Sequence, residues 1–585
     1  MCGFAGFISN NLIESQSRDN ILKMMGQSLL HRGPDQSGEF NYLKRGFSLV
    51  HQRLSILDTS ENGKQPMISP SGRFVIAFNG EIYNYKDLKS EIQKSDFYIN
   101  DWNSDSDTEV LLRCIEIWGL ERTLTKIVGM FSFALLDMEN DDLFLIRDRI
   151  GEKPLYYGCQ KGSFIFGSEL KALKVHSDFE NIIDRNSITL QLRFSSIPAP
   201  FSIYKGIKKL LPGTYIKLSL ANNNFQIENI PSPTPYWKLS NIISEGRKNV
   251  FLGGDNEAIG QLDKLLNKSI EQQMLSDVPL GAFLSGGVDS SSIVAIMQAQ
   301  SNKPIKTFTI GSDDQSYNEA KHAKLIAEYL QTDHTELYVS AQDALNIIPY
   351  LPKLYDEPFS DFSQIPTSIV SKLAKKQVTV SLSGDAGDEL FGGYNRYIGV
   401  NNWWSKINSM PFWLRMFLSS KILSISPLKW ENFEEFSSKV ISKRFPLGGL
   451  GNKMQKVGSV LGIKDASELY NHFVSNWSFP EEVVLKGVEP IILNIANEID
   501  FDDVASKMMA MDTMQYLPDD ILVKLDRAAM GESLETRVPF LDHRIIEFAW
   551  TLPLSMKIRS GQGKWILRQL LNKYVPNKLT ERPKT

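Results

Sequence analysis

The sequence has few cysteines, no long apolar run and almost no excess of either charge. Its three cysteines among 585 residues form an odd, sparse set, which favours a reducing compartment over a disulfide scaffold. The most apolar run, Ile127 to Leu136, is about half of the roughly 20 residues that a membrane span needs. The formal net charge of −4 argues against a protein that mainly holds nucleic acid, although it allows a small nucleotide ligand. We therefore expect a soluble cytoplasmic protein that binds neither membranes nor nucleic acid.

The length, about four times a common domain of roughly 150 residues, predicts two or three domains. A hydrophobic fraction of 42 % and a charged fraction of 23 % are ordinary for globular proteins and leave little room for extensive disorder. The polar tract from Leu220 to Asn256, which contains PSPTPYW, is typical of a linker between domains.

A cysteine directly follows the first methionine, in the sequence MCGFAGFIS. This segment has neither the basic nor the long apolar region of a secretory signal. Trimming of Met1 would leave Cys2 with a free α-amine, whose ordinary pKa of about 7.7–8.0 suits it as a base for the thiol on the same residue. The alternative is that Cys2 is only a small buried residue at the start of a strand.

Three polar motifs follow, each of which also has a purely structural explanation. Arg53 stands before a strand-like stretch in HQRLSILD (residues 51–58), and it fits an ordinary ion pair. Asn79 and Gly80 follow the apolar run FVIAF, where Asn-Gly predicts a turn. Asp107 opens the helical pattern SDTEVLL and fits a helix cap.

Together these motifs resemble the class II, N-terminal-nucleophile glutamine amidotransferases, from Cys2 to about residue 215. Further matching segments are HRGPD (31–35), IRDRIGEKPLYYG (146–158), FGSELKAL (166–173) and LPGTY (211–215). The resemblance implies that Cys2 attacks the side-chain amide of glutamine and that Asn79 and the Gly80 amide form the oxyanion hole. It also implies glutamine contacts for Arg53 with the α-carboxylate, for Asp107 and Glu81 with the α-amine, and for Leu54, Ser55, Ile56 and Leu57.

Strand-like and helix-like segments alternate from about residue 253. The expected strands cover residues 278–284, 306–311, 334–339 and 377–384, and the expected helices cover the stretch through Gln300, residues 318–331 and residues 367–376. Alternation of this kind predicts a parallel, doubly wound sheet with ligands at the carboxyl ends of its strands. Two glycine-rich segments fall at such ends, SGGVDSS (285–291) and SGDAGDE (383–389).

SGGVDSS has the composition of a phosphate-binding loop. Gly286 and Gly287 let backbone N–H groups turn inward, and the following helix adds its dipole; a tight turn without a ligand is the alternative. No Gly-Lys pair is followed by Ser or Thr, so this is not a Walker A loop. The segment resembles the loop of ATP pyrophosphatases, which cleave ATP between the α- and β-phosphates. That resemblance implies Mg²⁺ ligands at Asp289 and Asp388.

The whole chain is similar to the glutamine-hydrolysing asparagine synthetases of the B type. The later matching segments are DEPFSDFS (356–363), DELFGGYNRY (388–397) and LPDDILVKLDRAAMGESLETRVPFLD (517–542), and the resemblance is weakest over residues 398–505. It implies an αββα sandwich over residues 2–218, a linker over 219–252, and a parallel-sheet ATP-pyrophosphatase domain with added helices over 253–585. It implies ATP contacts for Leu284, Ser285, Gly286, Gly287, Asp289, Ser290, Ile310, Ser383 and Gly384.

The chain departs from this family in its second half. Asp385 and Ala386 stand where asparagine synthetases commonly have Glu and Gly, and the lost methylene moves a catalytic carboxylate by about 1 Å, enough to alter positioning. Lys584 matches the lysine that the family uses for the adenylation and amide-forming transition states, and only Thr585 follows it. Lys564 and Arg568 look family-like but also fit solvated positions on a helix.

The expected reaction converts glutamine, aspartate and ATP into glutamate, asparagine, AMP and pyrophosphate through β-aspartyl-AMP, with Mg²⁺ as cofactor. The alternative acceptors are other carboxylates, such as a sugar uronic acid or a peptide. A regulatory nucleotide-binding protein with an inactive catalytic domain is an alternative from another class. The expected partners are small-molecule substrates, and a homodimer is compatible with this interpretation. The aromatic tract over residues 401–417 is expected to pack between helices.

Overall fold

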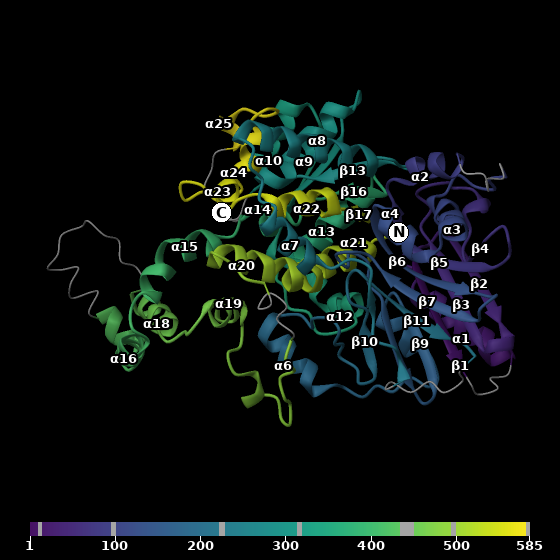
Figure 1. Cartoon of the computed structure of the whole chain (residues 1–585), viewed down its shortest axis with the longest axis horizontal. Helices are drawn as coiled ribbons and strands as arrows, with labels where there is room; N and C mark the ends of the chain where they lie inside the picture. The colour runs from purple at the N-terminus through teal and green to yellow at the C-terminus, as the bar shows by residue number, and fades with distance from the viewer. Residues whose placement is uncertain are drawn as a thin grey trace.

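The computed structural model describes residues 1–9, 15–94, 101–221, 229–312, 319–432, 450–492 and 499–580. Across these ranges the frame consists of two antiparallel sheets of six strands and one parallel sheet of five (Figure 1). The antiparallel sheets belong to the N-terminal part of the chain and the parallel sheet to the C-terminal part. None of the helices in these ranges is both long and apolar enough to cross a bilayer.

The two antiparallel sheets each interleave early and late segments of the N-terminal half. The first sheet has the order β10 (Ile207–Lys209), β8 (Tyr156–Gln160), β9 (Ser163–Gly167), β1 (Gly3–Ser9), β3 (Phe47–Arg53) and β2 (Gln36–Tyr42). The second has the order β12 (Thr234–Pro235), β11 (Thr214–Ser219), β7 (Asp142–Arg147), β6 (Gly129–Asp137), β5 (Phe74–Ile82) and β4 (Met67–Ile68).

Both faces of these sheets are covered, so their central strands read as continuous apolar runs. On β5, Val75 and Ala77 enter the core between the sheets, whereas Ile76 and Phe78 face the outer helices, because successive side chains alternate between faces. The helices on this outer face are α2 (Tyr85–Ile92), α3 (Asp107–Trp118) and α4 (Leu120–Lys126). Helices α1 (Ser15–Ser28) and α5 (Leu170–Lys174) cover the first sheet. The predicted αββα sandwich is confirmed.

The predicted turn at Asn79 and Gly80 is wrong. Strand β5 continues through both residues and pairs them with Ser132 and Phe131 of β6. A β-carbon at position 80 would lie 2.1 Å from the carbonyl oxygen of Met130. The glycine therefore allows the neighbouring strand to approach closely and does not form a turn. The buried ladder overrides the local turn preference of the Asn-Gly pair.

The C-terminal sheet is parallel, as predicted, with its strands ordered 15-14-13-16-17. These strands are β15 (Asp333–Val339), β14 (Lys306–Ser312), β13 (Leu280–Phe283), β16 (Val380–Leu382) and β17 (Glu535–Arg537). Figure 1 shows α8 (Asp255–Gln273), α9 (Val288–Gln300) and α10 (Ala320–Leu330) on one side of this sheet, and α13 (Gln364–Lys375) and α21 (Leu522–Met530) on the other. Phe308 of β14 joins a core with α13 and α21, whereas Ala282 of β13 joins the core that contains α8 and α9.

The remaining helices lie in both halves of the chain. They are α6 (Arg185–Phe194), α7 (Leu239–Lys248), α11 (Ala341–Ile347), α12 (Leu351–Tyr355), α14 (Gly387–Phe391), α15 (Asn395–Asn408), α16 (Phe412–Leu423), α18 (Leu450–Leu461), α19 (Ala466–Val474), α20 (Val504–Met511), α22 (His543–Thr551), α23 (Leu554–Lys557), α24 (Trp565–Leu571) and α25 (Asn577–Thr580). Between α20 and α21 the chain forms a π-helix, Asp512–Ile521.

The predicted linker contains packed structure. Thr234 pairs with Tyr215 at the edge of the second sheet, and α7 packs so closely against α22 that a β-carbon at Gly246 would lie 2.7 Å from the Trp550 carbonyl oxygen. This tract therefore joins the sandwich to the parallel-sheet half through contacts with both.

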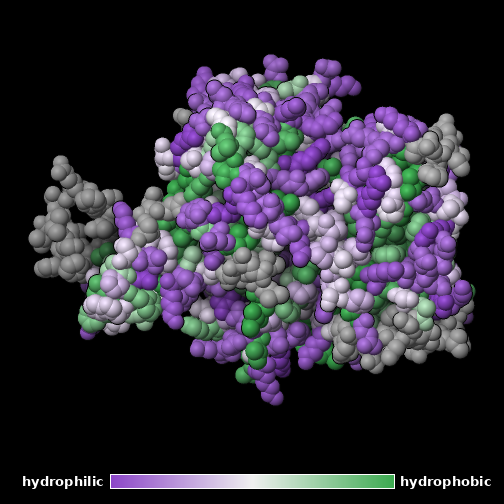
Figure 2. All heavy atoms as spheres, in the orientation of Figure 1, coloured by the Kyte–Doolittle hydropathy of each residue, from purple (hydrophilic) through white to green (hydrophobic). Residues whose placement is uncertain are grey.

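The aromatic tract only partly follows its prediction. Trp404 is buried, but Trp413 is 71 % exposed on α16. Helices α16 and α18 form an arm that projects from the parallel-sheet half in Figure 1, and Figure 2 shows hydrophobic surface on this arm.

Buried charges cross the contact between the two halves. The Arg32 guanidinium, which is fully buried, makes two hydrogen bonds of 2.8 and 2.9 Å to the Asp526 carboxylate on α21. Beside it, Arg527 forms a 2.7 Å ion pair with Glu169. Separation of the halves would take Asp526 from Arg32 and Glu169 from Arg527, although Arg32 would keep its 2.8 Å bond to Glu169 of its own half.

We expect Asp526→Ala to lower the free energy of unfolding by about 3 kcal/mol, because it leaves Arg32 without its two-point partner. Chemical denaturation measures this loss. The matched control is Asp255→Ala, which removes the part-exposed partner of Arg559 and is expected to cost less than about 1 kcal/mol. Equal losses in the two variants would contradict a dominant role for the buried pair.

Candidate active site

Cys2 lies just before β1, and it is buried beside the end of β5. Its backbone nitrogen donates a 3.0 Å hydrogen bond to Asn79 Oδ1. The same amide's Nδ2 is buried and has no hydrogen-bond partner among the described residues. The Cys2 backbone N–H therefore orients the Asn79 side chain, and Asn79 Nδ2 can donate to another molecule. An oxyanion hole needs this arrangement.

Burial raises the pKa of the Cys2 thiol, although the nearby N-terminal ammonium and Arg53 oppose this effect. The resting thiol is therefore protonated and needs a base before it can attack. In the chain that retains Met1, the Cys2 nitrogen is an amide and cannot be that base, and the terminal ammonium of Met1 instead lies 2.6 Å from Glu535 Oε2.

Arg53 ends β3 and organises the segment that follows it. Its guanidinium donates to the carbonyl oxygens of Leu57, Asp58 and Ser60 and to Gln36 Oε1. These bonds shape residues 54–57, the segment predicted to contact glutamine. The structure thus brings Arg53 and this segment to Cys2, but it shows Arg53 in a set of internal hydrogen bonds and not a surface ion pair.

Two carboxylates, Asp107 and Glu81, complete this cluster. Asp107 begins α3, and its Oδ2 accepts a 2.7 Å hydrogen bond from the Ile82 N–H. Burial raises the pKa of Asp107 to about 6, and burial together with the charges of Glu535 and Asp107 raises the pKa of Glu81. Arg537 of β17 lies 3.5 Å from Glu81, so the parallel-sheet half contributes a cation to this cluster.

The two glycine-rich segments of the parallel-sheet half meet each other. Gly286 has a φ of 72°, a left-handed conformation that favours glycine. Gly287 donates its N–H to Ser285 Oγ at 3.2 Å, and α9 begins at Val288. A β-carbon at Gly384 would lie 2.6 Å from the Ser290 nitrogen. The loop after β13 and the loop after β16 are therefore in direct contact; Leu284 directly follows β13, and Ile310 lies on β14.

Asp289 and Asp388 lie in the first turns of the helices that follow these two loops, α9 and α14, and share one cation. The Lys564 ammonium bonds to Asp289 Oδ2 and lies 2.7 Å from Asp388 Oδ1. Both carboxylates raise the pKa of Lys564, which is buried and not solvated. The sequence singled out Lys564 as family-like but left a solvated position open and did not predict this pairing, because the two aspartates are remote in the chain.

The Lys564 ammonium marks a point that both carboxylates reach, so the pair fits a magnesium ion. Mg²⁺ commonly uses one or two carboxylates together with substrate phosphates and water, and no group of three or more acidic, His or Cys ligands occurs among the described residues. The residues therefore suit a metal that arrives with a nucleotide.

Asp385 and Ala386 differ from the family pattern, and both have definite conformations here. Ser383 Oγ donates a 2.5 Å hydrogen bond to Asp385 Oδ2. Ala386 has a φ of 71°, where an L-residue with a β-carbon is strained by about 1–2 kcal/mol relative to glycine. Glu389 follows in α14; burial and Asp388 raise its pKa to about 7, and it accepts a 2.6 Å hydrogen bond from Tyr394. Lys584 lies outside the described residues.

The two halves match two family models. Residues 1–237 match the one described as a glutamine amidotransferase domain, and residues 261–585 match the one described as asparagine synthase. The chain belongs to the asparagine synthase family. It is thus an ATP-using ligase with a glutamine amidotransferase domain.

Two curated relatives cover all or most of this family member. Glutamine-hydrolyzing asparagine synthetase 1 of Bacillus subtilis is 31 % identical over 610 residues, which span 100 % of this chain and 86 % of the relative. Putative asparagine synthetase 2 of Methanocaldococcus jannaschii is 31 % identical over 557 residues, 91 % of this chain and 98 % of the relative.

Two solved structures also match part of the chain. The allosteric regulatory enzyme of purine biosynthesis has 15 % identity and a TM-score of 0.29 over 58 % of this chain and 80 % of its own. The glutamine phosphoribosylpyrophosphate amidotransferase of B. subtilis has 16 % identity and a TM-score of 0.27 over 57 % of this chain and 65 % of its own. The fold assignment rests on the sheet order and not on these values.

We expect Lys564→Ala to lower the melting temperature of this protein, and we expect added Mg²⁺ to raise the melting temperature of the variant again. Loss of the shared ammonium leaves Asp289 and Asp388 in mutual repulsion, at a cost of about 2 kcal/mol, and a divalent cation can replace it. Thermal unfolding with and without Mg²⁺ measures both effects. The control is Lys573→Ala, which removes a more exposed partner of Asp263. An equal Mg²⁺ effect in both variants would rule out the aspartate pair as a cation site.

Proposed function

We propose that this protein makes asparagine: it hydrolyses glutamine to glutamate and ammonia, adenylates aspartate with ATP, and aminates the β-aspartyl-AMP. The products are asparagine, AMP and pyrophosphate. The observation that carries this proposal is the presence of two separate sites in one chain, a buried cysteine beside an oriented amide and a glycine-rich loop pair around two carboxylates. Full-length similarity to asparagine synthetases supports the choice of aspartate.

The glutamine half uses the residues around Cys2. After removal of Met1, the Cys2 α-amine takes the thiol proton, and the sulfur attacks the amide carbon of glutamine. Asn79 Nδ2 and the Gly80 N–H stabilise the oxyanion, each by a few kcal/mol. A zwitterionic substrate needs one cation and one or two carboxylates, and Arg53, Asp107 and Glu81 supply them. Arg53 then exchanges part of its carbonyl contacts for the α-carboxylate.

The synthetase half places ATP on the two glycine-rich loops. Backbone N–H groups at Gly286, Gly287 and the start of α9 hold phosphate oxygens, and Leu284, Ile310, Ser383 and Gly384 surround the AMP moiety. Mg²⁺ on Asp289 and Asp388 neutralises phosphate charge when bound. Asp385 positions the acceptor carboxylate for attack on the α-phosphate, and Lys584 stabilises the transition states.

We expect the purified chain to form asparagine and pyrophosphate from aspartate, glutamine and Mg-ATP in a one-to-one ratio. A panel with a hexuronic acid and an acidic peptide tests the alternative acceptors. These alternatives stand because Asp385 departs from the residue common in the family. Pyrophosphate and amide formation are measured directly. ADP as the nucleotide product would overturn the mechanism, and pyrophosphate release with another acid alone would replace aspartate as the substrate.

The variant Cys2→Ala distinguishes the reaction of the glutamine half from that of the synthetase half. We expect it to abolish glutamine use by at least about 10³-fold, because the nucleophile is lost, while added ammonium still supports asparagine formation. Mass spectrometry of the wild type is expected to show a chain that starts at Cys2. Loss of the ammonium-dependent reaction in a folded Cys2→Ala protein would contradict this division of labour.

The KM for glutamine should rise as the pH falls through about 6, by about tenfold per unit below it. Asp107 has its pKa raised to about 6, so below that pH it is protonated and no longer pairs with the substrate α-ammonium. Initial rates between pH 5 and 8 measure the dependence. Asp107→Asn should raise the KM throughout and remove this inflection, and an unchanged inflection would assign it to another group.

A further inference from the structure

The arm formed by α16 and α18 carries an apolar stripe on its outer surface. On α16, Trp413 is 71 % exposed, Met416 45 % and Phe417 53 %. Residues three and four positions apart lie on the same face of a helix, so these three side chains form one continuous stripe, which we call the outer stripe. Figure 2 shows hydrophobic surface on this arm. Contiguous apolar surface of this kind marks a site of contact with a partner or a membrane.

The polar side of α16 is buried against α18 and the turn after it, which is the reverse of an ordinary surface helix. Arg415 is 3 % exposed, and its guanidinium donates a 3.1 Å hydrogen bond to the Ile463 carbonyl oxygen. Ser419 Oγ donates a 2.7 Å hydrogen bond to the carbonyl oxygen of Gly458. These bonds fix the rotation of α16 about its axis. The outer stripe therefore cannot turn inward without breaking hydrogen bonds of buried polar groups.

The charged residues of the two helices are all basic. They are Arg415 and Lys421 on α16 and Lys453 and Lys456 on α18. The three lysines are exposed, and the Lys421 ammonium lies 5.6 Å from the centre of the Phe417 ring, beside the outer stripe. The arm thus presents aromatic side chains together with positive charge, which is the composition of helices that lie in a membrane interface.

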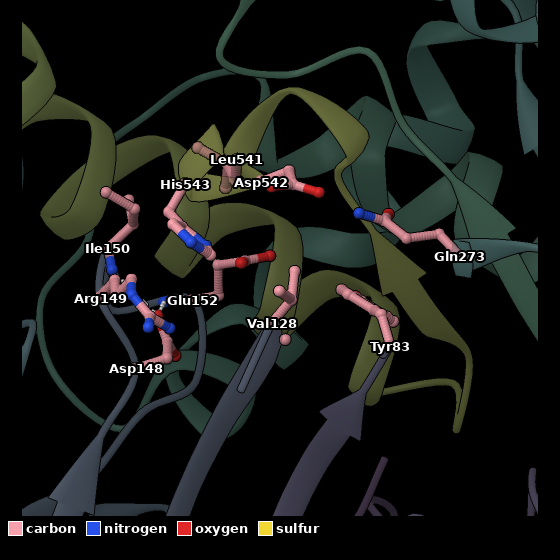
Figure 3. A pocket seen from close by; sticks show the side chains of 11 residues that line it. Tyr83, Val128, Asp148, Arg149, Ile150, Glu152, Gln273, Leu541, Asp542 and His543 are labelled. Atoms are coloured by element: carbon pink, nitrogen blue, oxygen red, sulfur yellow. Dashed lines mark hydrogen bonds between the residues drawn. The ribbon is translucent and has the colours of Figure 1, made fainter. Parts of the chain in front are cut away.

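The contact between the two halves shows how surface is covered elsewhere in this molecule. Tyr83 and Val128 face Gln273, Asp542 and His543 there across a cavity of about 10 Å³ (Figure 3). That volume is close to the smallest that holds one water molecule, so the two halves pack closely around it. The outer stripe is different, because it lies on an arm that projects from the parallel-sheet half (Figure 1) and stays exposed in the folded chain.

The charge and the shape of the arm favour a bilayer over a second copy of the chain. In a two-fold dimer through this face, the same basic patch of each copy would meet its counterpart, and the like charges would repel each other. The surface of an anionic bilayer instead attracts each lysine near it. A projecting arm also reaches a flat surface without interference from the rest of the molecule.

We propose that the outer stripe docks this protein on the surface of an anionic lipid bilayer. The rings of Trp413 and Phe417 enter the boundary between the headgroups and the acyl chains, and the exposed lysines of the arm lie among the lipid phosphates. Helix α16 lies in the plane of the surface, so docking needs no spanning segment. The prediction that the protein binds no membrane rested on the lack of a spanning run in the sequence, which does not test this mode of binding.

Flotation with lipid vesicles tests this docking. The full chain is mixed either with vesicles of phosphatidylglycerol and phosphatidylcholine in equal parts or with vesicles of phosphatidylcholine alone, and the protein that floats is measured against lipid concentration. We expect binding to the anionic vesicles that weakens as salt is added, because salt screens the lysines. Trp413→Ser should weaken this binding by at least about tenfold, because burial of the indole in the interface is lost.

Two comparisons separate docking from folding. Phe417→Ser should also weaken binding, whereas Phe479→Ser makes the same change at a phenylalanine that is 66 % exposed outside the arm and should match the wild type. Trp413→Phe keeps an aromatic ring and should retain most of the binding. Thermal unfolding of each variant is measured alongside and should match the wild type, because the substituted side chains are exposed.

Each outcome decides for or against the docking. Absence of binding to the anionic vesicles by the folded wild type overturns the proposal, as does an equal effect of Phe417→Ser and Phe479→Ser. Light scattering of the lipid-free chain covers the alternative, because a dimer that Trp413→Ser converts into a monomer would assign the outer stripe to a second copy. No substrate is present in these measurements, so their result is independent of the proposed function.

Discussion

Pairing of buried charges across the contact between the two halves is the constraint on which the rest of the structure depends. Arg32 bonds to Asp526, and Arg527 bonds to Glu169; these residues lie where water cannot replace a lost partner. Breaking such pairs is costly, whereas their net contribution when intact is modest. The pairs therefore fix the relative position of the halves more than they stabilise either one.

Strand β17 shows what that fixed position achieves. Its three residues belong to the parallel sheet, yet Glu535 bonds to the chain terminus and Arg537 lies beside Glu81 of the sandwich. The carbonyl oxygen of Arg537 also accepts from Ser383 in the loop that precedes α14. One short strand thus contacts both candidate sites, so a shift in its register would disturb them together.

Much of this arrangement could be predicted from the sequence. The alternation of segments predicted four of the five parallel strands but not β17, and the helix expected to end at Gln300 ends there, because strand-like runs, a loop of glycines and a polar helix start are local signals. The turn at Asn79 and Gly80 was wrong, because a doubly covered sheet overrides a local preference. The ion pair of Lys564 was beyond reach, although the residue itself looked family-like, since its Asp289 partner is 275 positions away and no local pattern indicates such a contact. The pairing of Glu535 with the terminus, 534 positions apart, was hidden for the same reason.

Two features of one loop also explain why the motifs alone did not identify the acceptor substrate. Asp385 is one methylene shorter than the usual family residue, and its neighbour Ala386 adopts a backbone conformation that glycine would take more readily. Both features lie in the loop that the nucleotide and the acceptor would share. The sequence therefore identifies the loop but not the acid that binds there.

The close approach of Gly384 to the Ser290 nitrogen sets a boundary for protein engineering. The two loops are interlocked at that point, and a side chain at position 384 would wedge them apart and misalign whatever lies between them. Diversity introduced at this loop therefore belongs at position 385, where a side chain already exists, and not at Gly387, where a β-carbon would lie 2.5 Å from the Asp289 carboxylate carbon. A library that spares position 384 would keep the contact between the two loops intact.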